Sequence, residues 1–426
     1  MSEALAHTSD RQSMLSFLRN MVFAGVSAAS AGLLLLLLVI ASRRLGEVEY
    51  GKFSFALALG TVFETLMDFG LHQVAIRAVA RDRSMALRIF RNSLGLKAIW
   101  ALGALVLLVA AATVLRSEPD VRLACYLIGS SLVLRSYMLT VRGVLQGLER
   151  FGWDSFVVIA DRLLLLVAGA LALEAGGGLR GLALAFVVSR AVALLLAAAL
   201  ARRQIGPVGV SFDRALWSEL QRTAIPLGLF LVVINLYSRI DTVMLGVFRT
   251  DAETGFYQNA YSVYEGLTYL PSILAAVLTP RLAALFVTDR RRHHRVAIAG
   301  VTASAGLAVV VGVVTFLYAD PLMTALFGIQ FRASAAPFRI LSAGLFLVYA
   351  IWILHVTAIS MNREKLLLAT GIVGLVAKVA LNAFLIPHYG PSGAAVAVLL
   401  GEAVSVVFIT RGLLRRQDDP TRLERT

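Results

Sequence analysis

Fifteen ionisable side chains lie inside long apolar stretches of this sequence, where a charge needs a physical reason. The nine cations are Arg77, Lys97, Arg135, Arg162, Arg190, Arg239, Arg281, Arg339 and Lys378, and the six carboxylates are Glu64, Asp68, Asp161, Asp241, Glu265 and Glu402. At the centre of a bilayer each charge costs about 2.5–3.5 kcal/mol, so these groups must face protein or water. The arginine fork binds phosphate oxygens through two hydrogen bonds at any working pH, so the set favours recognition of a phosphate group.

Five of the cations lie deep in their apolar stretches, and we expect them to contact the ligand. They are Arg135, Arg162, Arg190, Arg239 and Lys378. The alternative is internal pairing, for example of Arg239 with Asp241 or Glu265. Structural roles are expected for three cations nearer the ends of their stretches, where a long stem reaches the headgroup layer: Lys97, Arg281 and Arg339.

Four of the carboxylates are candidates for ion coupling, because an acid buried in a bilayer beside cations can exchange a proton. They are Glu64, Asp68, Asp241 and Glu402. Glu64 and Asp68 are four residues apart, so they share one face of a helix and could hold a proton between them. The alternative is that they hold the interior arginines in place.

Several kinds of site are not expected. The sequence has no GxxxxGK[ST] phosphate loop, so the chain by itself does not resemble an ATP-driven pump. His293 and His294 stand in a run of arginines without acidic or cysteine partners at ligand spacing, which favours a solvated loop over a metal site. No Ser/His/Asp set converges, and the single cysteine, Cys125, cannot form an intramolecular disulfide. We therefore expect no catalytic residues, no metal and no cofactor.

The elements that position these residues are predicted to be membrane-spanning helices. The 426 residues are 58% hydrophobic and 15% charged, and the mean hydropathy is +0.79. Apolar runs of about 20 residues without period-two alternation favour helices over strands. We predict twelve spans: 18–41, 53–78, 93–115, 121–142, 156–174, 179–200, 223–248, 258–287, 297–318, 335–361, 366–386 and 391–414. Tyr257, Tyr261, Tyr264 and Tyr269 are expected in an interfacial belt, with sugar stacking as the alternative.

The distribution of Lys and Arg predicts the topology. With a cytoplasmic N-terminus, 23 cations fall in inside segments and 8 in outside segments. The positive-inside rule therefore favours two cytoplasmic termini and an even number of spans. The net charge of +14 is divided among short loops rather than gathered on one domain, so no nucleic-acid partner is expected.

Two weak internal similarities predict a duplicated architecture. Glu49 to Phe53 resembles Glu253 to Tyr257, with the two glycines 204 residues apart, and Arg180 to Ala183 resembles Ser392 to Ala395. Copies separated by an even number of spans share one orientation, which favours two bundles related by an axis along the membrane normal. The predicted domains are an N-terminal six-helix bundle over 1–200, a cytoplasmic linker over 201–222, a C-terminal six-helix bundle over 223–414 and a cytoplasmic tail over 415–426.

Five segments of the sequence stand out together: LGEVEYGKFSFALALGTVFETLMDFGL from Leu45, LQGLERFGWD from Leu145, SRIDTVMLGVFRTDAETGFYQNAYSVYE from Ser238, LTPRLAALF from Leu278 and KVALNAFLIPHYGPSGAAVA from Lys378. In register, they resemble the Wzx-type polysaccharide flippases, a polysaccharide-transport branch of the multidrug/oligosaccharidyl-lipid/polysaccharide exporter superfamily. Arg77 follows the first segment at the spacing of the family pattern, so the resemblance adds it to the ligand contacts. The resemblance implies an all-α membrane protein of about twelve helices in two pseudo-symmetric six-helix bundles around a central cavity.

The resemblance also implies an activity. Members of the Wzx-type flippase family carry undecaprenyl-diphosphate-linked oligosaccharides from the cytoplasmic to the periplasmic leaflet of the bacterial inner membrane. We expect alternating access driven by an ion gradient or the membrane potential, a monomer, and contacts with membrane lipids and with the polymerase and glycosyltransferases of one O-antigen or exopolysaccharide pathway. The alternative function is a drug or metabolite cation antiporter of the same superfamily, although nine interior cations argue against it. A membrane-bound polymerase or ligase would need larger outside loops.

Overall fold

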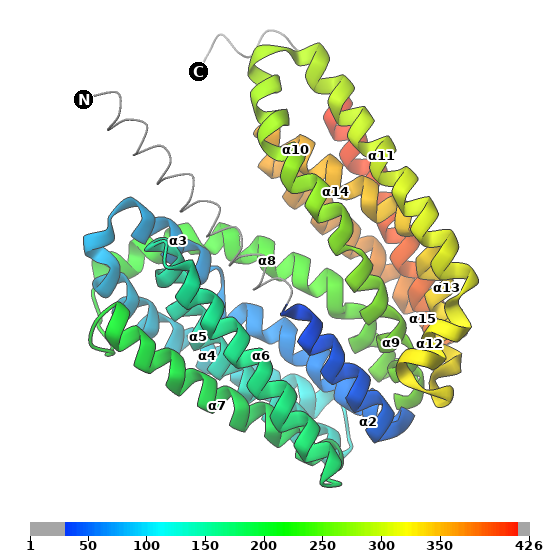
Figure 1. Ribbon diagram of the computed structural model, residues 1–426, viewed down its shortest axis with the longest axis horizontal. Coiled ribbons are helices and arrows are strands. Elements are labelled where there is room, and N and C mark those ends of the chain that lie inside the picture. Colours follow the sequence, from blue (N-terminus) through cyan, green and yellow to red (C-terminus); the bar gives the residue numbers. More distant parts are fainter. Residues whose placement is uncertain (1–29, 416–426) are drawn as a thin grey trace, which may run out of the picture. The chain divides into compact units, whose positions relative to one another are not determined.

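The fold consists of helices throughout the part of the chain that the computed structural model describes, residues 30–415 (Figure 1). Contacts between residues divide it into two compact units. Unit 1 comprises residues up to Leu45 together with Leu59–Val232, and unit 2 comprises Gly46–Ala58 together with the residues from Val233. The predicted start of the first span and most of the predicted tail, residues 416–426, lie outside the described residues.

Unit 1 is built mainly from long helices that pack side by side. They are parts of α2 (Ala31–Asp68) and α8 (Arg214–Phe248), with α3 (Leu71–Arg81), the short η1 (Arg83–Met85), α4 (Ala86–Leu115), α5 (Pro119–Gly147), α6 (Phe151–Glu174) and α7 (Gly178–Gln204). In Figure 1, α5, α6 and α7 lie next to one another. Their shared core contains Val141, Val157 and Ala197, while the outward-facing side chains, such as Leu102 and Leu195, are large, apolar and exposed. This arrangement suits a lipid environment, in which apolar side chains gain nothing by burial.

Unit 2 contains the remaining helices and several breaks. They are α9 (Asp251–Leu267), α10 (Tyr269–Thr288), α11 (Arg290–Leu317), α12 (Ala319–Phe327), η2 (Ile329–Ser334), α13 (Ala335–Ala343), α14 (Leu345–Ser360) and α15 (Glu364–Arg415). The α13–α14 pair bends by 45° at Gly344. The long α15 has a kink at Gly390, where φ is +54°, a conformation that favours glycine.

The prediction of an all-α membrane protein is confirmed. Within the described residues, eight helices are long and apolar enough to cross a bilayer, and the bent α13–α14 pair makes a ninth candidate. These nine segments contain the predicted spans from 93–115 onward, because the kinked α15 covers the last two. The predicted first and second spans fall on α2 and α3. There the chain turns at Gly46 and breaks again at Phe69 and Gly70, so helix boundaries differ from the predicted ones.

The repeated Glu-x-Gly sequence marks a close helix crossing inside unit 2. A Cβ atom added to Gly51 would lie 1.7 Å from the carbonyl oxygen of Asp251, and one added to Gly255 would lie 2.9 Å from that of Glu47. Residues 47 and 251 are separated by the same 204 positions as the two glycines, so the two contacts are equivalent by the repeat. Such exchange of contacts is typical of a pseudo-two-fold axis, and it agrees with the predicted duplication.

The predicted linker, residues 201–222, is attached to the first turns of α4. Arg91 Nε donates to the carbonyl of Pro207 at 3.0 Å, and Asn92 accepts from the backbone of Asp213 at 2.8 Å. Asp213 in turn caps the start of α8 and pairs with Arg88. The predicted domain boundaries remain a prediction, since the units defined by contacts divide α8 at Val232 and place residues 46–58 with unit 2.

Candidate functional site

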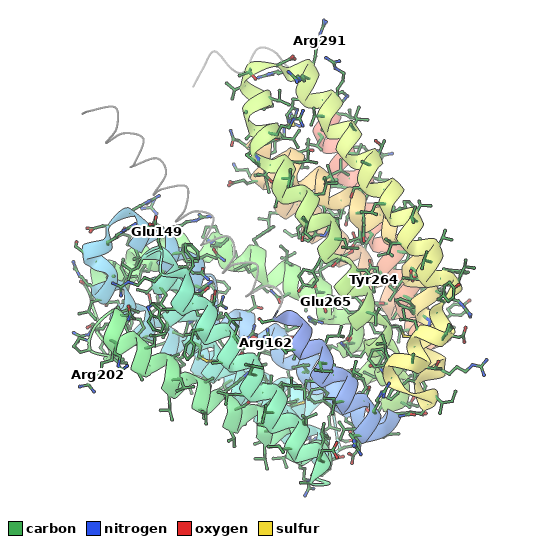
Figure 2. All side chains as sticks on the ribbon, viewed as in Figure 1. Glu149, Arg162, Arg202, Tyr264, Glu265 and Arg291 are labelled. Atoms are coloured by element: carbon green, nitrogen blue, oxygen red, sulfur yellow. The ribbon has the colours of Figure 1, made fainter. Side chains whose placement is uncertain are left out.

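Unit 1 holds one group of interior charges, which we call the arginine cluster: Arg135, Arg142, Arg162 and Arg190 with Glu64, Asp154 and Asp161. The helices α2, α5, α6 and α7 supply these side chains. Arg135 and Arg142 are seven residues apart on α5, which places them two turns apart on the same face. Asp161 and Arg162 are adjacent on α6, and Figure 2 labels Arg162 there. Four guanidinium groups thus share three carboxylates.

Three of the four arginines have a carboxylate partner. Arg135 Nη1 donates to both oxygens of Glu64, at 2.9 and 2.7 Å. Arg142 Nε donates to Asp154 at 2.7 Å. The third pair is looser: Arg190 Nε lies 3.9 Å from Asp161 Oδ1, and neither atom has a hydrogen-bond partner within the described residues.

Arg162 is the exception. Within residues 30–415 no carboxylate oxygen lies in ion-pair range, 4.0 Å, of its half-buried guanidinium group. It lines a cavity of about 30 Å³ together with Arg135, Arg142 and Asp161, between α5 and α6. A cavity of this size holds a water molecule or two. The cluster therefore carries one formal positive charge in excess beside a small polar cavity, which is a suitable surrounding for an anionic oxygen.

A second pair in unit 1 is fully enclosed. Lys97 Nζ donates to Asp68 at 2.7 Å and to the carbonyl of Ser136 at 2.6 Å, and its side chain is 0% exposed. The expectation that Lys97 extends to the headgroup layer is therefore wrong. A neighbouring carboxylate and a carbonyl offset the cost of burying the ammonium group at that depth. Glu64 and Asp68 each have their own cation. This arrangement is the one expected if the two carboxylates hold interior cations in place, which was the alternative to ion coupling.

Unit 2 holds a group of interior polar side chains around a lysine, which we call the lysine cluster: Lys378, Asp241, Asn382, Tyr237, Tyr257 and Glu402. Lys378 Nζ lies 2.6 Å from Asp241 Oδ2 and 2.7 Å from the carbonyl of Tyr237, above the Tyr237 ring at 4.3 Å from its centre. Two further donors reach Asp241, Asn382 Nδ2 at 2.6 Å and the Tyr257 hydroxyl at 2.9 Å. Both Lys378 and Asp241 are 0% exposed, so this ion pair is closed to solvent.

Two carboxylates flank that pair. Glu402 accepts a hydrogen bond from the Tyr237 hydroxyl at 2.9 Å. Arg239 donates to both oxygens of Glu265, at 3.3 and 2.9 Å, and Figure 2 labels Glu265 on α9. Of the two partners considered for Arg239 in the sequence, Glu265 is the one found. Asp241, Glu265 and Glu402 thus stand against two cations, Lys378 and Arg239, in this part of unit 2.

The structure thus separates the six predicted ligand contacts. Arg135, Arg162 and Arg190 come together in unit 1, whereas Arg239 and Lys378 belong to unit 2, each with a carboxylate. Arg77 is exposed on α3 and does not line the cavity of the arginine cluster. The roles of all six in ligand binding stay predictions, as do the ion-coupling roles of Glu64, Asp68, Asp241 and Glu402.

Arg142 belongs to the arginine cluster but is absent from the predicted ligand contacts. It is the last residue of the predicted span 121–142, and its spacing from Arg135 places both on one helix face. Four tyrosines, from Tyr257 to Tyr269, were expected in an interfacial belt, and that expectation is wrong for the three that lie on α9. Tyr257, Tyr261 and Tyr264 are buried, with ring centres 5.7 and 5.8 Å apart along the series. Their spacing of three or four residues, which gathers them on one helix face, was the available signal.

Comparisons with known proteins give a consistent result. The family described as polysaccharide biosynthesis protein matches residues 17–286. Two proteins of Haloferax volcanii are similar to the chain: the probable flippase AglR, 25% identical over 186 residues, and the probable low-salt glycan biosynthesis flippase Agl15, 24% identical over 172 residues. These matches cover 42% and 40% of this chain but only 38% and 36% of the relatives, so the chain matches well under half of their length.

Solved structures are similar over nearly the whole chain. The lipid II flippase MurJ in an inward closed conformation has a TM-score of 0.73 at 13% identity, covering 92% of this chain and 87% of that one. An inward-facing multidrug resistance MATE transporter has a TM-score of 0.74 at 15% identity, covering 93% and 98%. At these identities the likeness shows a shared fold.

Proposed function

This chain belongs to the polysaccharide biosynthesis protein family, and from that membership we propose that it carries a lipid-linked oligosaccharide across the bacterial inner membrane. The proposed substrate is an undecaprenyl-diphosphate-linked oligosaccharide that moves from the cytoplasmic to the periplasmic leaflet. Its flippase relatives, a transporter fold and a multi-pass chain support this function over an enzymatic one. Both termini are proposed to be cytoplasmic.

The single observation that carries the proposal is the charge surplus of the arginine cluster. A diphosphate that leaves water loses its hydration, which costs far more than any single contact returns, so its path needs fixed cations. Arg162 has no carboxylate partner within the described residues, and Arg135 and Arg142 line the same cavity. Three guanidinium groups around one cavity can bind several phosphate oxygens through charge-assisted hydrogen bonds. We infer that Arg162 is the first contact and that Arg135 joins it when Glu64 is displaced.

Alternating access is the proposed mechanism, with the two units changing their arrangement around the bound headgroup while the polyprenyl chain remains in lipid. The membrane potential can supply the energy. Two negative charges that move outward across an inside-negative membrane gain about 4–5 kcal/mol per 100 mV, less any charge that the protein carries back. An ion gradient acting through the carboxylates of unit 2 is the second proposed source.

The test is translocation in vesicles that contain the purified protein and a polyprenyl-diphosphate-linked oligosaccharide, with the sugar detected by a reagent that cannot cross the membrane. Arg162→Ala should reduce the rate at least tenfold, and Arg162→Lys, which keeps the charge but loses the fork, should lie between. The matched control is Arg202→Ala, an exposed arginine at the end of α7 (Figure 2). A folded Arg162→Ala variant with the wild-type rate would remove the arginine cluster from the substrate path.

The same vesicles distinguish the rival function. A drug or metabolite cation antiporter would accumulate a quaternary ammonium dye in exchange for protons or sodium and would ignore the lipid-linked sugar. Translocation of the sugar without dye exchange would support the flippase, and the reverse result would replace it by the antiporter.

A further inference from the structure

Unit 2 has an apolar groove on its surface, and none of the lining residues belongs to either charge cluster. Its volume is about 230 Å³, and it lies between α11 and the α13–α14 pair. The lining residues are apolar except for one serine: Ala308, Val309, Gly312, Val313, Phe316, Leu317, Ser342, Ala343 and Phe346. Val309, Val313 and Leu317 are 54%, 52% and 66% exposed, so this wall faces outward from the helices.

The break at Gly344 explains why a groove is present here. The 45° bend between α13 and α14 changes the direction of one wall at the level of Ser342 to Phe346. On the opposite wall Gly312 allows close approach, since an added Cβ atom would lie 2.7 Å from the carbonyl oxygen of Ser342. Small residues at this crossing and large ones beside it leave a channel along α11. From Ala308 to Leu317 it is about 14 Å long at the rise of a helix.

Two arginines lie at the end of this groove. Arg339 precedes Ser342 by three residues on α13, so it lies one turn beyond the groove wall. On the other side α11 ends at Leu317, and Asp320 follows in the first turn of α12. Asp320 pairs with Arg339, and Arg332 Nε lies 3.6 Å from its other oxygen. The side chains of Arg332 and Arg339 are 72% and 41% exposed.

An apolar channel that ends at an excess of positive charge matches one ligand chemistry. Two guanidinium groups share a single carboxylate, which leaves one charge able to bind a phosphate at the level of the headgroups. The groove on the same wall would take a hydrocarbon chain. We propose that this surface binds an anionic glycerophospholipid, with its phosphate on Arg332 and Arg339 and one acyl chain between α11 and α13–α14.

The assignment to a membrane phospholipid follows from the exposure of the site. Both arginines and the outward groove wall are open to the surroundings of the helices, where phospholipid is the abundant anion with an acyl chain. The site is remote in sequence from the arginine cluster and does not depend on the proposed transport. Its failure and the failure of the proposed function are therefore separate results.

Native mass spectrometry of the purified full chain tests the proposal, after incubation with equal amounts of phosphatidylglycerol and phosphatidylcholine. We expect wild-type protein to retain phosphatidylglycerol preferentially. The double variant Arg332→Ala/Arg339→Ala should weaken retention about tenfold, the change expected for one lost charge-assisted bond. Val313→Phe, which fills the groove, should weaken it by a similar factor while leaving both arginines in place.

Matched controls exist on the same protein. Arg44→Ala removes an exposed arginine that has its own carboxylate, Glu174, and Val106→Phe enlarges a 59% exposed side chain on α4 outside the groove. Both should retain phosphatidylglycerol as wild type does. Equal retention of the two lipids, an equal loss in Arg44→Ala, or no effect of Val313→Phe would overturn the proposal. Displacement of phosphatidylglycerol by equimolar polyprenyl phosphate would also overturn it, because the site would then serve the isoprenoid lipid.

Discussion

In unit 1, four arginines share three carboxylates beside a cavity that has room for water, whereas in unit 2 a lysine and an arginine face three carboxylates among close-packed tyrosines. Within the described residues, Arg162 of the first group has no carboxylate in ion-pair range. The second encloses its central pair completely, with Lys378 and Asp241 both 0% exposed. The arginine cluster therefore has one more cation than carboxylates, whereas the lysine cluster together with the Arg239–Glu265 pair has one more carboxylate than cations.

The difference shows that interior charge alone does not identify a ligand site. A buried pair with every polar atom engaged holds helices in register, and removing one member leaves a charge that nothing solvates. A charge without its own partner, beside a cavity, is free to exchange water for a ligand oxygen. By this criterion Arg162 is a candidate for binding and Lys378 is a candidate for structure. The carboxylate surplus of the lysine cluster, in which Asp241 and Glu402 face one lysine, suits a cation or proton better than a diphosphate.

The largest effect is expected for Lys378→Met. Asp241 would remain buried without its cation, and the free energy of unfolding should fall by about 3–5 kcal/mol. The melting temperature in detergent measures it, and Arg162→Met is the matched control, because that arginine has no ion pair within residues 30–415 and should change stability little. Adding Asp241→Asn to Lys378→Met should restore most of the loss. If Lys378→Met melts with the wild type while Arg162→Met does not, the contrast between the units is reversed.

A second prediction increases the charge surplus of unit 1. Glu64→Gln frees Arg135 for the ligand, so the apparent affinity for the diphosphate lipid should rise up to about tenfold, the value of one charge-assisted hydrogen bond. Release should slow in proportion. The measurement is the substrate concentration for half-maximal translocation in vesicles, and Glu174→Gln, in an exposed pair with Arg44, is the control. A lower affinity in Glu64→Gln would mean that the paired geometry of Arg135 is itself the binding state.

The sequence predicts the contrast between the two clusters for some residues and not for others. Hydropathy located the spans and identified Arg162, Arg190 and Lys378 as interior, because a charge within an apolar run has nowhere else to lie. The partners were not predictable in the same way. Arg239 has two carboxylates within reach along the chain, and only the packing of α8 on α9 selects Glu265.

The position of a charged residue along its predicted span was a poorer guide to whether its side chain is buried. Lys97 lies near the predicted start of its span, yet helix α4 begins earlier, at Ala86, and the ammonium group is enclosed by Asp68 and Ser136. Arg142 is the last residue of its predicted span, yet helix α5 continues to Gly147, beyond the predicted end. Hydropathy finds the apolar middle of a helix but not its polar turns, and in this chain those turns carry part of the site.

A smaller change in stability tests whether the lysine cluster of unit 2 is closed to solvent. Tyr257→Phe removes the hydroxyl that donates to Asp241, and the loss of one hydrogen bond to a charged group should cost about 1.5–3 kcal/mol. Tyr261→Phe is the control, because its ring stacks in the same row and its hydroxyl makes no hydrogen bond within the described part of the chain. The melting temperatures of the two variants should differ accordingly. Equal melting temperatures would show that Asp241 is held by Lys378 and Asn382 alone.

The smallest effect concerns an ion pair outside the membrane-spanning segments, where solvent weakens the attraction between the two charges. The hydrogen bond from the Arg88 guanidinium holds the pKa of Asp213 below its ordinary value of 3.8. A carboxylate with a lowered pKa stabilises the folded chain above its unfolded pKa, and this contribution is lost as the pH falls through the folded value. Stability should therefore not change through this pair between pH 6 and pH 8, and should decline only below about pH 4.

Asp213→Asn keeps the helix cap but removes the charge, so at pH 7 it should lower the melting temperature by about 2 °C or less, and the difference should vanish in acid. High salt should reduce it too, because exposed pairs are screened. The enclosed pair of Lys378 and Asp241 should be insensitive to salt at any concentration. A salt-sensitive Lys378→Met effect would mean that water reaches the lysine cluster, and the distinction between an open and a closed unit would no longer hold.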